Sequence, residues 1–345
     1  MSNLIIDPYV FACPQSNEGI DAFRNYIESI ISWREFADEG WARVFVSEQT
    51  VTVLAETNSY PLWDSLKSAI AQLNIVDVQA KDIVDVVNAL LQRLPSIETE
   101  FGLRDVLADS IVSNPEYHLA TRPPIFVEQY YRIAIMVCLV AQVRGFDELS
   151  QVLITRLLNE DLVSSEIRAT IHDCESSFEQ GLENFPLHLQ GRLQLCNTPH
   201  GLYLAVDPLD IWIGASSDQE CAHALHLFLY QKVYKAKRER LSQDDLQWSM
   251  GDSFCESVMR LGFLANRGRM RTLLRACADT ILRENLSQTR WLRTGSGAED
   301  PQLERGTDRA WRRTIDHEYR LHYWETALGP ELASVVAHND MSIPF

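Results

Sequence analysis

Residues 4–11 read Leu-Ile-Ile-Asp-Pro-Tyr-Val-Phe, a short apolar run that ends in an aspartate and a proline. Three consecutive aliphatic residues are typical of a strand that is buried on both faces of a sheet. Apolar residues then recur at helical spacing between Ile20 and Ile31, and residues 43–46 form a second strand candidate. Two buried strands joined by a long helix predict a parallel sheet that is covered by helices.

The same alternation continues to about residue 120. Ser47 is well placed to cap a helix after the second strand, and Pro61 suits the first turn of a further helix. The further predicted elements are helices over residues 47–57, 61–73 and 81–94 and a third strand over residues 75–78. The sequence therefore predicts a small parallel-sheet α/β domain over residues 1–120.

Two regions of different character follow. Residues 121–184 are predicted as a helical region, with helices over 125–145, 146–158 and 164–180. Residues 185–345 are predicted as an α+β domain that begins with an antiparallel hairpin within residues 187–206. Its other predicted elements are helices over 218–236, 253–264 and 269–284 and a strand over 319–324. The predicted fold class is therefore mixed α/β.

Composition indicates a soluble, globular, cytoplasmic protein. Of the 345 residues, 46% are hydrophobic and 23% charged, which suffices for a buried core. The most apolar segment, residues 133–141, is far shorter than the roughly 20 residues that cross a bilayer, so a buried helix and no membrane contact are expected. The seven cysteines are odd in number and form no CxxC pair, which favours reduced thiols.

The net charge of −17 is distributed unevenly along the chain. From residue 232 onward there are 18 Lys and Arg against 16 Asp and Glu, whereas the preceding part has 13 against 32. An acidic surface repels a phosphate backbone, so any contact with nucleic acid is expected in the C-terminal third. The alternative is an acidic surface that serves solubility alone.

Several carboxylates follow the predicted strands. Asp7 comes directly after the first strand, and Glu48 and Glu56 follow the second. Asp105 and Asp109 are predicted on one helical face because four residues separate them. Ligands bind beyond the carboxyl ends of parallel strands, so Asp7 is placed where it could bind a metal ion or a substrate. The structural alternative is that Asp7 caps the turn before Pro8 and the other acids are solvated.

These residues carry a resemblance to a known family. The run that begins at residue 4, followed after a helix by Val-Phe-Val-Ser-Glu-Gln-Thr-Val-Thr-Val-Leu-Ala-Glu at residues 44–56, resembles the opening of PIN-like nucleases. The resemblance implies that Asp7 and Glu56 hold Mg²⁺ or Mn²⁺ for phosphodiester hydrolysis. The residues that it implies for the catalytic set are Asp7, Glu48, Glu56, Asp105 and Asp109, although the later aspartates of the family have no close match here.

The densest basic and aromatic segment lies at residues 288–324. If residues 319–324 form a strand, its alternation places Arg320, His322 and Trp324 on one face. Arginine, histidine and tryptophan together suit contact with phosphates and bases. The other candidates for this contact are Arg290, Arg293, Arg312 and Arg313. The same residue types also dominate protein interfaces, so a protein partner or a homo-oligomer is the alternative.

A second basic segment, residues 232–240, holds five cations and one acid near a predicted helix end. The helix dipole accounts for it, and nucleic acid is the alternative. No Walker A loop, GxGxxG turn, GxSxG elbow or HExxH motif is present, which disfavours the corresponding enzyme families. The sequence thus predicts a metal-dependent nuclease, or a degenerate PIN-like protein, acting on nucleic acid in a prokaryotic, antiviral setting. The alternative is a non-catalytic subunit of a larger nucleic-acid-processing or defence complex.

Overall fold

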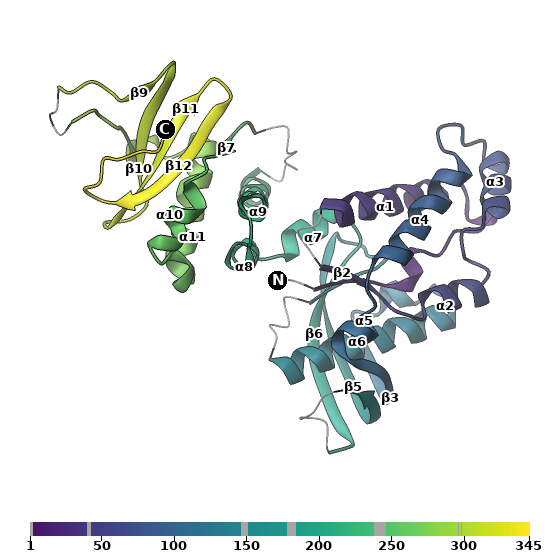
Figure 1. Ribbon diagram of the computed structural model, residues 1–345. Coiled ribbons are helices and arrows are strands. Elements are labelled where there is room, and N and C mark those ends of the chain that lie inside the picture. The colour runs from purple at the N-terminus through teal and green to yellow at the C-terminus, as the bar shows by residue number, and fades with distance from the viewer. Residues whose placement is uncertain are drawn as a thin grey trace. The chain divides into compact units, whose positions relative to one another are not determined.

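The chain folds into two compact units, Met1–Val206 and Asp207–Phe345 (Figure 1). The computed structural model describes residues 3–39, 43–145, 151–177, 184–237, 246–295, 297 and 299–345. The boundaries predicted at residues 120 and 184 both fall inside the first unit, because strands from beyond residue 120 complete the sheet begun by the N-terminal strand.

A six-stranded sheet forms the centre of the first unit, in the order β2-β1-β4-β6-β5-β3. The strands β2, β1, β4 and β6 run parallel, and β5 and β3 are added antiparallel. Their bounds are β1 (Asn3–Ile6), β2 (Arg43–Val46), β3 (Leu103–Asn114), β4 (Gln151–Ile154), β5 (Leu162–Ser176) and β6 (Leu187–Cys196). The first two strands confirm the prediction from the sequence.

The neighbour of β1 on its other side was not predicted. All four residues of β4 are buried, as a strand covered on both faces requires. The prediction of a helix over residues 146–158 is wrong at β4, because a short apolar run such as Val152 to Ile154 has no period that distinguishes a helix from a strand. Residues 146–150 lie outside the described part of the chain. Residues 75–78, predicted as a strand, form no regular structure.

The two antiparallel strands also correct predicted helices. In β5 the buried residues Ser165, Ile167, Ala169 and Ile171 alternate with more exposed ones, so the period is two and not that of a helix. The helix predicted over residues 164–180 is therefore wrong over its described part. The expected helical face of Asp105 and Asp109 is wrong as well, because both residues lie on β3.

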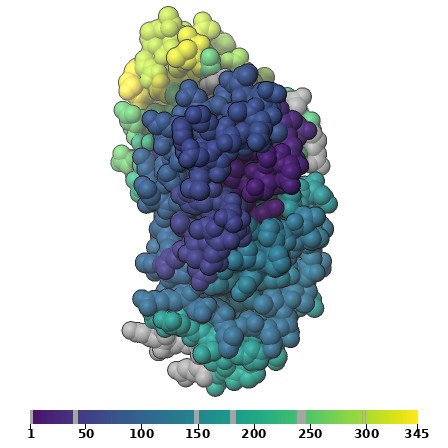
Figure 2. Space-filling view, turned by 90° about the vertical axis from the view of Figure 1, so that its right-hand side faces the viewer, coloured from purple at the N-terminus to yellow at the C-terminus, as the bar shows by residue number. Residues whose placement is uncertain are grey.

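Helices occupy most of the remaining first unit. Figure 1 shows β2 with α1 and α4 on one side and α6 on the other, and in Figure 2 residues of the blue range form much of the visible face. The helices are α1 (Ile20–Glu39), α2 (Thr50–Glu56), α3 (Trp63–Gln72), α4 (Ala80–Arg93), α5 (Ile97–Phe101), α6 (Pro124–Arg144) and α7 (Pro199–Ala205), with 3-10 turns η1 (Pro8–Val10), η2 (Ser16–Glu18) and η3 (Tyr117–Leu119). The predicted helices that correspond to α1–α4 and α6 are confirmed.

The helix α7 replaces the second strand of the predicted hairpin. Thr198 accepts a hydrogen bond from the Gly201 amide at 3.1 Å, and Pro199 occupies the first helical position. A threonine cap followed by proline is a helix start signal, and here it outweighs the alternating pattern of residues 202–206.

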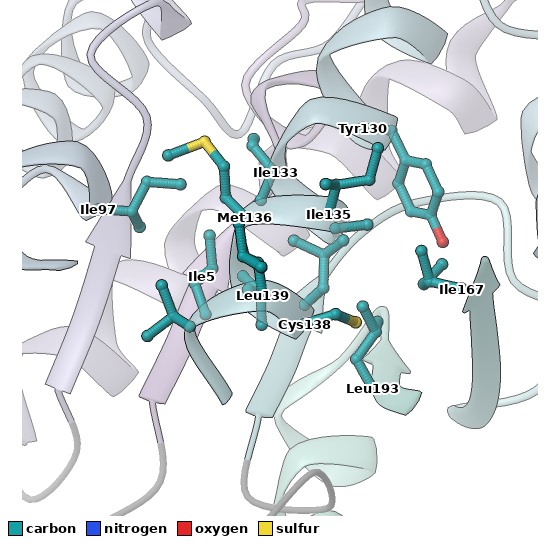
Figure 3. Packing of buried hydrophobic residues seen from close by; sticks show 14 of the residues in the cluster. Ile5, Ile97, Tyr130, Ile133, Ile135, Met136, Cys138, Leu139, Ile167 and Leu193 are labelled. Atoms are coloured by element: carbon teal, nitrogen blue, oxygen red, sulfur yellow. The ribbon is translucent and has the colours of Figure 1, made fainter. Parts of the chain in front are cut away.

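The core of the first unit is built around α6. Figure 3 shows its residues Ile133, Met136 and Leu139 packed among side chains from the sheet, including Ile5 and Ile167. Among the described residues, α6 is the one helix long and apolar enough to cross a membrane by length and composition. However, 67% of that window is buried inside the protein, as in the core helix of a soluble domain.

The second unit joins a mainly antiparallel sheet to helices. Its strand order is β7-β12-β11-β10-β8, and β9 pairs with β10 beside β8. The strands are β7 (Ser249–Met250), β8 (Thr289–Trp291), β9 (Glu304–Arg305), β10 (Asp308–Thr314), β11 (Tyr319–Thr326) and β12 (Gly329–Ala337). The helices are α8 (Pro208–Gly214), α9 (Asp218–Lys237), α10 (Phe254–Arg260) and α11 (Arg267–Ile281), with 3-10 turns η6 (Phe263–Ala265) and η7 (Leu286–Gln288). The predicted helices and the strand at residues 319–324 are confirmed, with shifted ends.

Candidate functional site

Asp7 lies at the carboxyl end of β1, where the sequence placed it, but its carboxylate is fully buried. One oxygen, Oδ2, accepts hydrogen bonds from Arg122 Nη1 at 2.5 Å and from Thr155 Oγ1 at 2.6 Å. The other oxygen accepts the Tyr9 amide at 3.1 Å and so caps η1, as the structural alternative expects. Thr155 directly follows β4, so the carboxyl ends of two parallel strands meet in this network.

Arg122 supplies the positive charge at this position. Its Nε donates to the His118 carbonyl at 2.9 Å, and its Nη2 donates to Thr155 Oγ1 and to the Arg156 carbonyl. The guanidinium also lies 4.8 Å from the ring centre of Tyr9. A buried carboxylate that is already paired and hydrogen-bonded does not present open oxygens to a divalent cation. Asp7 therefore fits a structural ion pair, and its geometry does not fit a metal anchor.

The two predicted glutamates stand apart from this network. Glu48 Oε1 accepts hydrogen bonds from Ser96 Oγ at 2.7 Å and Thr99 Oγ1 at 2.9 Å, and these bonds, that of Ser96 first, lower the pKa of its carboxyl group. Glu56 is exposed at the end of α2. The buried glutamate of this region is Glu98, which the sequence analysis missed. It accepts Ser47 Oγ at 2.6 Å and pairs with Arg132 at 3.0 Å.

Asp105 and Asp109 are exposed on the edge strand β3. Asp105 lies 3.6 Å from Arg132, and Asp109 lies 2.9 Å from His172, whose hydrogen bond lowers the pKa of Asp109. Over the described residues, no three His, Cys, Asp or Glu side chains are grouped so that they could hold a metal ion. Asp7, Glu48, Asp105 and Asp109 thus have partners within the protein, and Glu56 is exposed. Binding of Mg²⁺ or Mn²⁺ by these residues stays a prediction.

A buried histidine neighbours the Asp7 network. His118 has no exposed surface, and neither ring nitrogen has a hydrogen-bond partner. Its ring meets that of Tyr130 edge-on, with centroids 5.0 Å apart. Burial and the nearby charge of Arg122 lower the pKa of His118 from 6.5 to about 4, and Asp7 opposes this shift. The imidazole is therefore neutral in the folded protein.

The lowered pKa of His118 predicts a loss of stability in acid. Since the unfolded chain takes up this proton near pH 6.5 and the folded chain only near pH 4, stability is full above pH 6.5 and falls between these values, with a slope of at most about 1.4 kcal/mol per pH unit. His118→Phe keeps the ring contacts and should remove this slope from chemical denaturation curves. The exposed His188→Phe should not, and an unchanged slope in His118→Phe would contradict the assignment.

A group of arginines without carboxylate partners lines a pocket in the described part of the second unit. This pocket has a volume of about 600 Å³, and its named walls contain three arginines, two tryptophans and no carboxylate. The lining residues are Thr289, Arg290, Trp291, Arg293, Gly295, Gly297, Trp311, Arg312, His338, Asn339 and Met341. The sequence predicted three of these, Arg290, Arg293 and Arg312, and the structure brings them together.

The register of the sheet sets the positions of these side chains. Arg290 on β8 lies opposite Arg312 on β10, and Trp291 lies opposite Trp311 with ring centroids 6.4 Å apart. Side chains alternate along a strand, so the arginine pair and the tryptophan pair point to opposite faces. Both pairs line the pocket, which therefore lies at β8, the last strand of the sheet, and at its neighbour β10. The two tryptophans were missed, although their place next to the predicted arginines was a usable signal.

The three arginines have neutral partners. Arg290 donates to the carbonyls of Ser287 and Thr289 at 3.1 and 3.2 Å, Arg293 donates to the carbonyl of Asp300, and Arg312 contacts the sulfur of Met341 at 3.2 Å. By contrast, Arg305 of the same unit binds the carboxylates of Asp308 and Glu331. Among the described residues, none of the three pocket arginines forms an ion pair with a carboxylate, and the nearby Asp300 carboxylate accepts the Gly297 amide at 2.6 Å. Their charge is available to an anion.

The other residues that the sequence predicted for contact with nucleic acid or a partner do not line this pocket. Arg313 and Trp324 are buried, and so is His322, which contradicts their expected place on a binding surface. The C-terminal segment covers this face, where His322 Nδ1 donates to the Ser342 carbonyl at 2.7 Å and Trp324 Nε1 donates to the Pro344 carbonyl at 2.8 Å. Arg320 is half-buried, and burial, with the nearby charge of Arg312, lowers its pKa.

No family model, curated protein or solved structure matches this chain.

Proposed function

We propose that the chain binds single-stranded nucleic acid through the pocket at the edge of β8. The observation that carries the proposal is the set of Arg290, Arg293 and Arg312 around one pocket without a carboxylate partner among the described residues. Arginine pairs well with phosphate, because its planar guanidinium offers donors in a fixed geometry and keeps its charge. Three such groups suit a phosphodiester backbone.

The tryptophans support a nucleic acid over a simple anion. Trp291 is 49% exposed, and Trp311 lies beside it. Bases of a single strand stack on aromatic side chains with about 1–3 kcal/mol per base, largely independent of sequence. A duplex offers no free base faces, so a single strand is the better match.

The charge of the two units supports placing the contact in the second one. Residues 207–345 contain 18 Lys and Arg against 20 Asp and Glu, whereas residues 1–206 contain 13 against 28. The first unit therefore repels polyanions, and the second is nearly neutral, so that an unpaired arginine cluster sets the local potential. The proposal assigns no cleavage chemistry to the acids of the first unit.

A protein partner is the second candidate. The strand β8 ends the sheet, with no strand paired on its outer side in the described residues, and such an edge can accept a strand from a partner. With Trp291 exposed beside it, this edge suits a subunit of a larger complex.

Binding of fluorescent single-stranded RNA and DNA 12-mers over a range of salt concentrations tests the proposal. Three phosphate contacts predict that log K falls with log salt with a slope of about −2. The triple variant Arg290→Gln, Arg293→Gln and Arg312→Gln should lose affinity by about 100-fold at low salt and most of the slope.

The matched control removes the same charge from arginines that are paired with carboxylates. Arg269, Arg283 and Arg309 pair with Glu318, Glu325 and Glu304, respectively. The variant in which these three arginines are replaced by glutamine should keep most of the affinity for the 12-mers. Equal losses of affinity in both triple variants would show that only the net charge of the chain matters. If the wild-type chain binds neither the RNA nor the DNA 12-mer, the proposal is wrong.

A further inference from the structure

A second groove in the same unit lies between α9 and α11. It has a volume of about 560 Å³, and its walls combine apolar and charged side chains. Its apolar members are Pro208, Leu209 and Phe228, and its charged members are Asp207, Lys232, Lys235, Arg271, Arg275, Asp279 and Glu284; Gln231 and Asn285 complete it. The sequence had marked Lys232 and Lys235 as part of a basic segment.

The carboxylates of this groove are already bound within the protein. Asp279 and Glu284 both pair with Lys232. Asp207 accepts Arg267 at 2.9 Å and lies 3.7 Å from Arg271.

Two cations of the groove are not used to bind these carboxylates. Lys235 and Arg275 are exposed and have no carboxylate partner within the described ranges. The groove therefore presents positive charge to a ligand, although acidic and basic side chains both line it.

The groove and the pocket share a short connecting segment. Asn285 lines the groove and Thr289 lines the pocket, so three residues lie between them, and an extended chain places the Cα atoms of Asn285 and Thr289 at most about 14 Å apart. A stacked strand with the duplex rise of about 3.4 Å per nucleotide spans this distance with about four nucleotides.

Arg313 holds this segment to the sheet. From β10 it donates to the carbonyls of Glu284 at 2.7 Å and Asn285 at 3.4 Å. The groove end of the connecting segment is therefore attached to β10.

We infer that a single strand bound at the pocket continues past η7 into the groove between α9 and α11, where Lys235 and Arg275 bind its phosphates and Phe228 contacts a base. This inference rests on the proposed function and extends its contact surface to a strand of more than four nucleotides. Apolar and cationic side chains in one groove suit the bases and phosphates of a single strand.

The test compares a 4-mer and a 12-mer of deoxythymidylate on the full chain. In the variant Lys235→Gln, Arg275→Gln, affinity for the 12-mer should fall about 10-fold and its salt slope should lose about one unit, while affinity for the 4-mer stays the same. The control Arg269→Gln, Arg283→Gln removes the same charge from paired arginines and should change neither. A 12-mer can bind the pocket in more positions along its length than a 4-mer, so it binds more tightly for that reason alone. The inference is therefore tested by comparing the wild type with the variant for each oligomer, and not by comparing the two oligomers with each other.

Three results would overturn the inference. One is an unchanged 12-mer affinity in the groove variant with 4-mer binding intact, which leaves the proposed function standing. Another is an equal loss for both oligomers. The third is an acidic peptide, poly-glutamate, that binds the wild type and not the groove variant while nucleic acid binds both equally. If neither oligomer binds the wild type, the proposed function and this inference fail together.

Discussion

Replacement of Arg122 by alanine is expected to lower the free energy of unfolding of the first unit by about 3–5 kcal/mol. Asp7 is fully buried, and Arg122 is the cation that neutralises it at 2.5 Å. Without the guanidinium, the Asp7 carboxylate keeps one strong donor in Thr155 and has no compensating charge. Amide hydrogen exchange resolves the first unit from the second, and protection of β1 and β4 should fall most.

The matched control is Arg168→Ala. This arginine pairs with Glu166 at 2.8 Å but is 61% exposed, so its loss should cost about 1 kcal/mol or less. The double variant Arg122→Ala, Asp7→Asn should recover part of the stability, because it removes the unpaired buried charge of Asp7. If Arg122→Ala behaves like Arg168→Ala, the buried ion pair is not what stabilises this edge of the sheet.

Arg313→Ala should destabilise the second unit by about 3 kcal/mol or more. Arg313 is 1% exposed, and it donates to three backbone carbonyls that follow α11 or belong to its end, those of Asp279, Glu284 and Asn285. Hydrogen bonds from a charged donor contribute about 1.5–3 kcal/mol each, and the substitution also leaves a cavity. Lysine should not rescue the loss, because a single ammonium cannot reach three separated acceptors in the geometry of a guanidinium.

The neighbouring Arg312 provides the control on the same strand. Its contact is with the sulfur of Met341, and it is half-buried, so Arg312→Ala should change stability by less than about 1 kcal/mol. Exchange protection of α11 and β10 measures both variants. Equal effects of the two substitutions would contradict the division between a structural Arg313 and a binding Arg312.

Local sequence signals were sufficient for the first two strands and most helices. They failed at β4 and β5. The three apolar residues of β4, Val152 to Ile154, are equally compatible with a buried helix, and only the pairing of β4 with β1, almost 150 positions away in the chain, makes them a strand. The alternation of β5 was visible in Ile167, Ala169 and Ile171 and was assigned the wrong period.

The candidate sites show the same limit. Asp7 at the end of a buried strand has the sequence pattern of a metal ligand and of an ion pair, and its partner Arg122 is 115 positions away. In the C-terminal block, Arg312 and Arg313 are adjacent and were predicted to act alike. Because they lie on β10, alternation sends one to the pocket and the other into the core. Recognising residues 308–314 as a strand would have separated them.

The attachment of the C-terminal segment bears on how freely this part of the protein can vary in sequence. The atoms that accept the hydrogen bonds of His322 and Trp324 are the backbone carbonyls of Ser342 and Pro344, which any residue supplies. Met341, His338 and Asn339 line the pocket from the same segment. Evolution can therefore exchange His338 and Asn339, and with them the chemistry of the pocket, without losing the path of the chain, provided that the two donors on β11 and the packing of Met341 and Ile343 against the core persist.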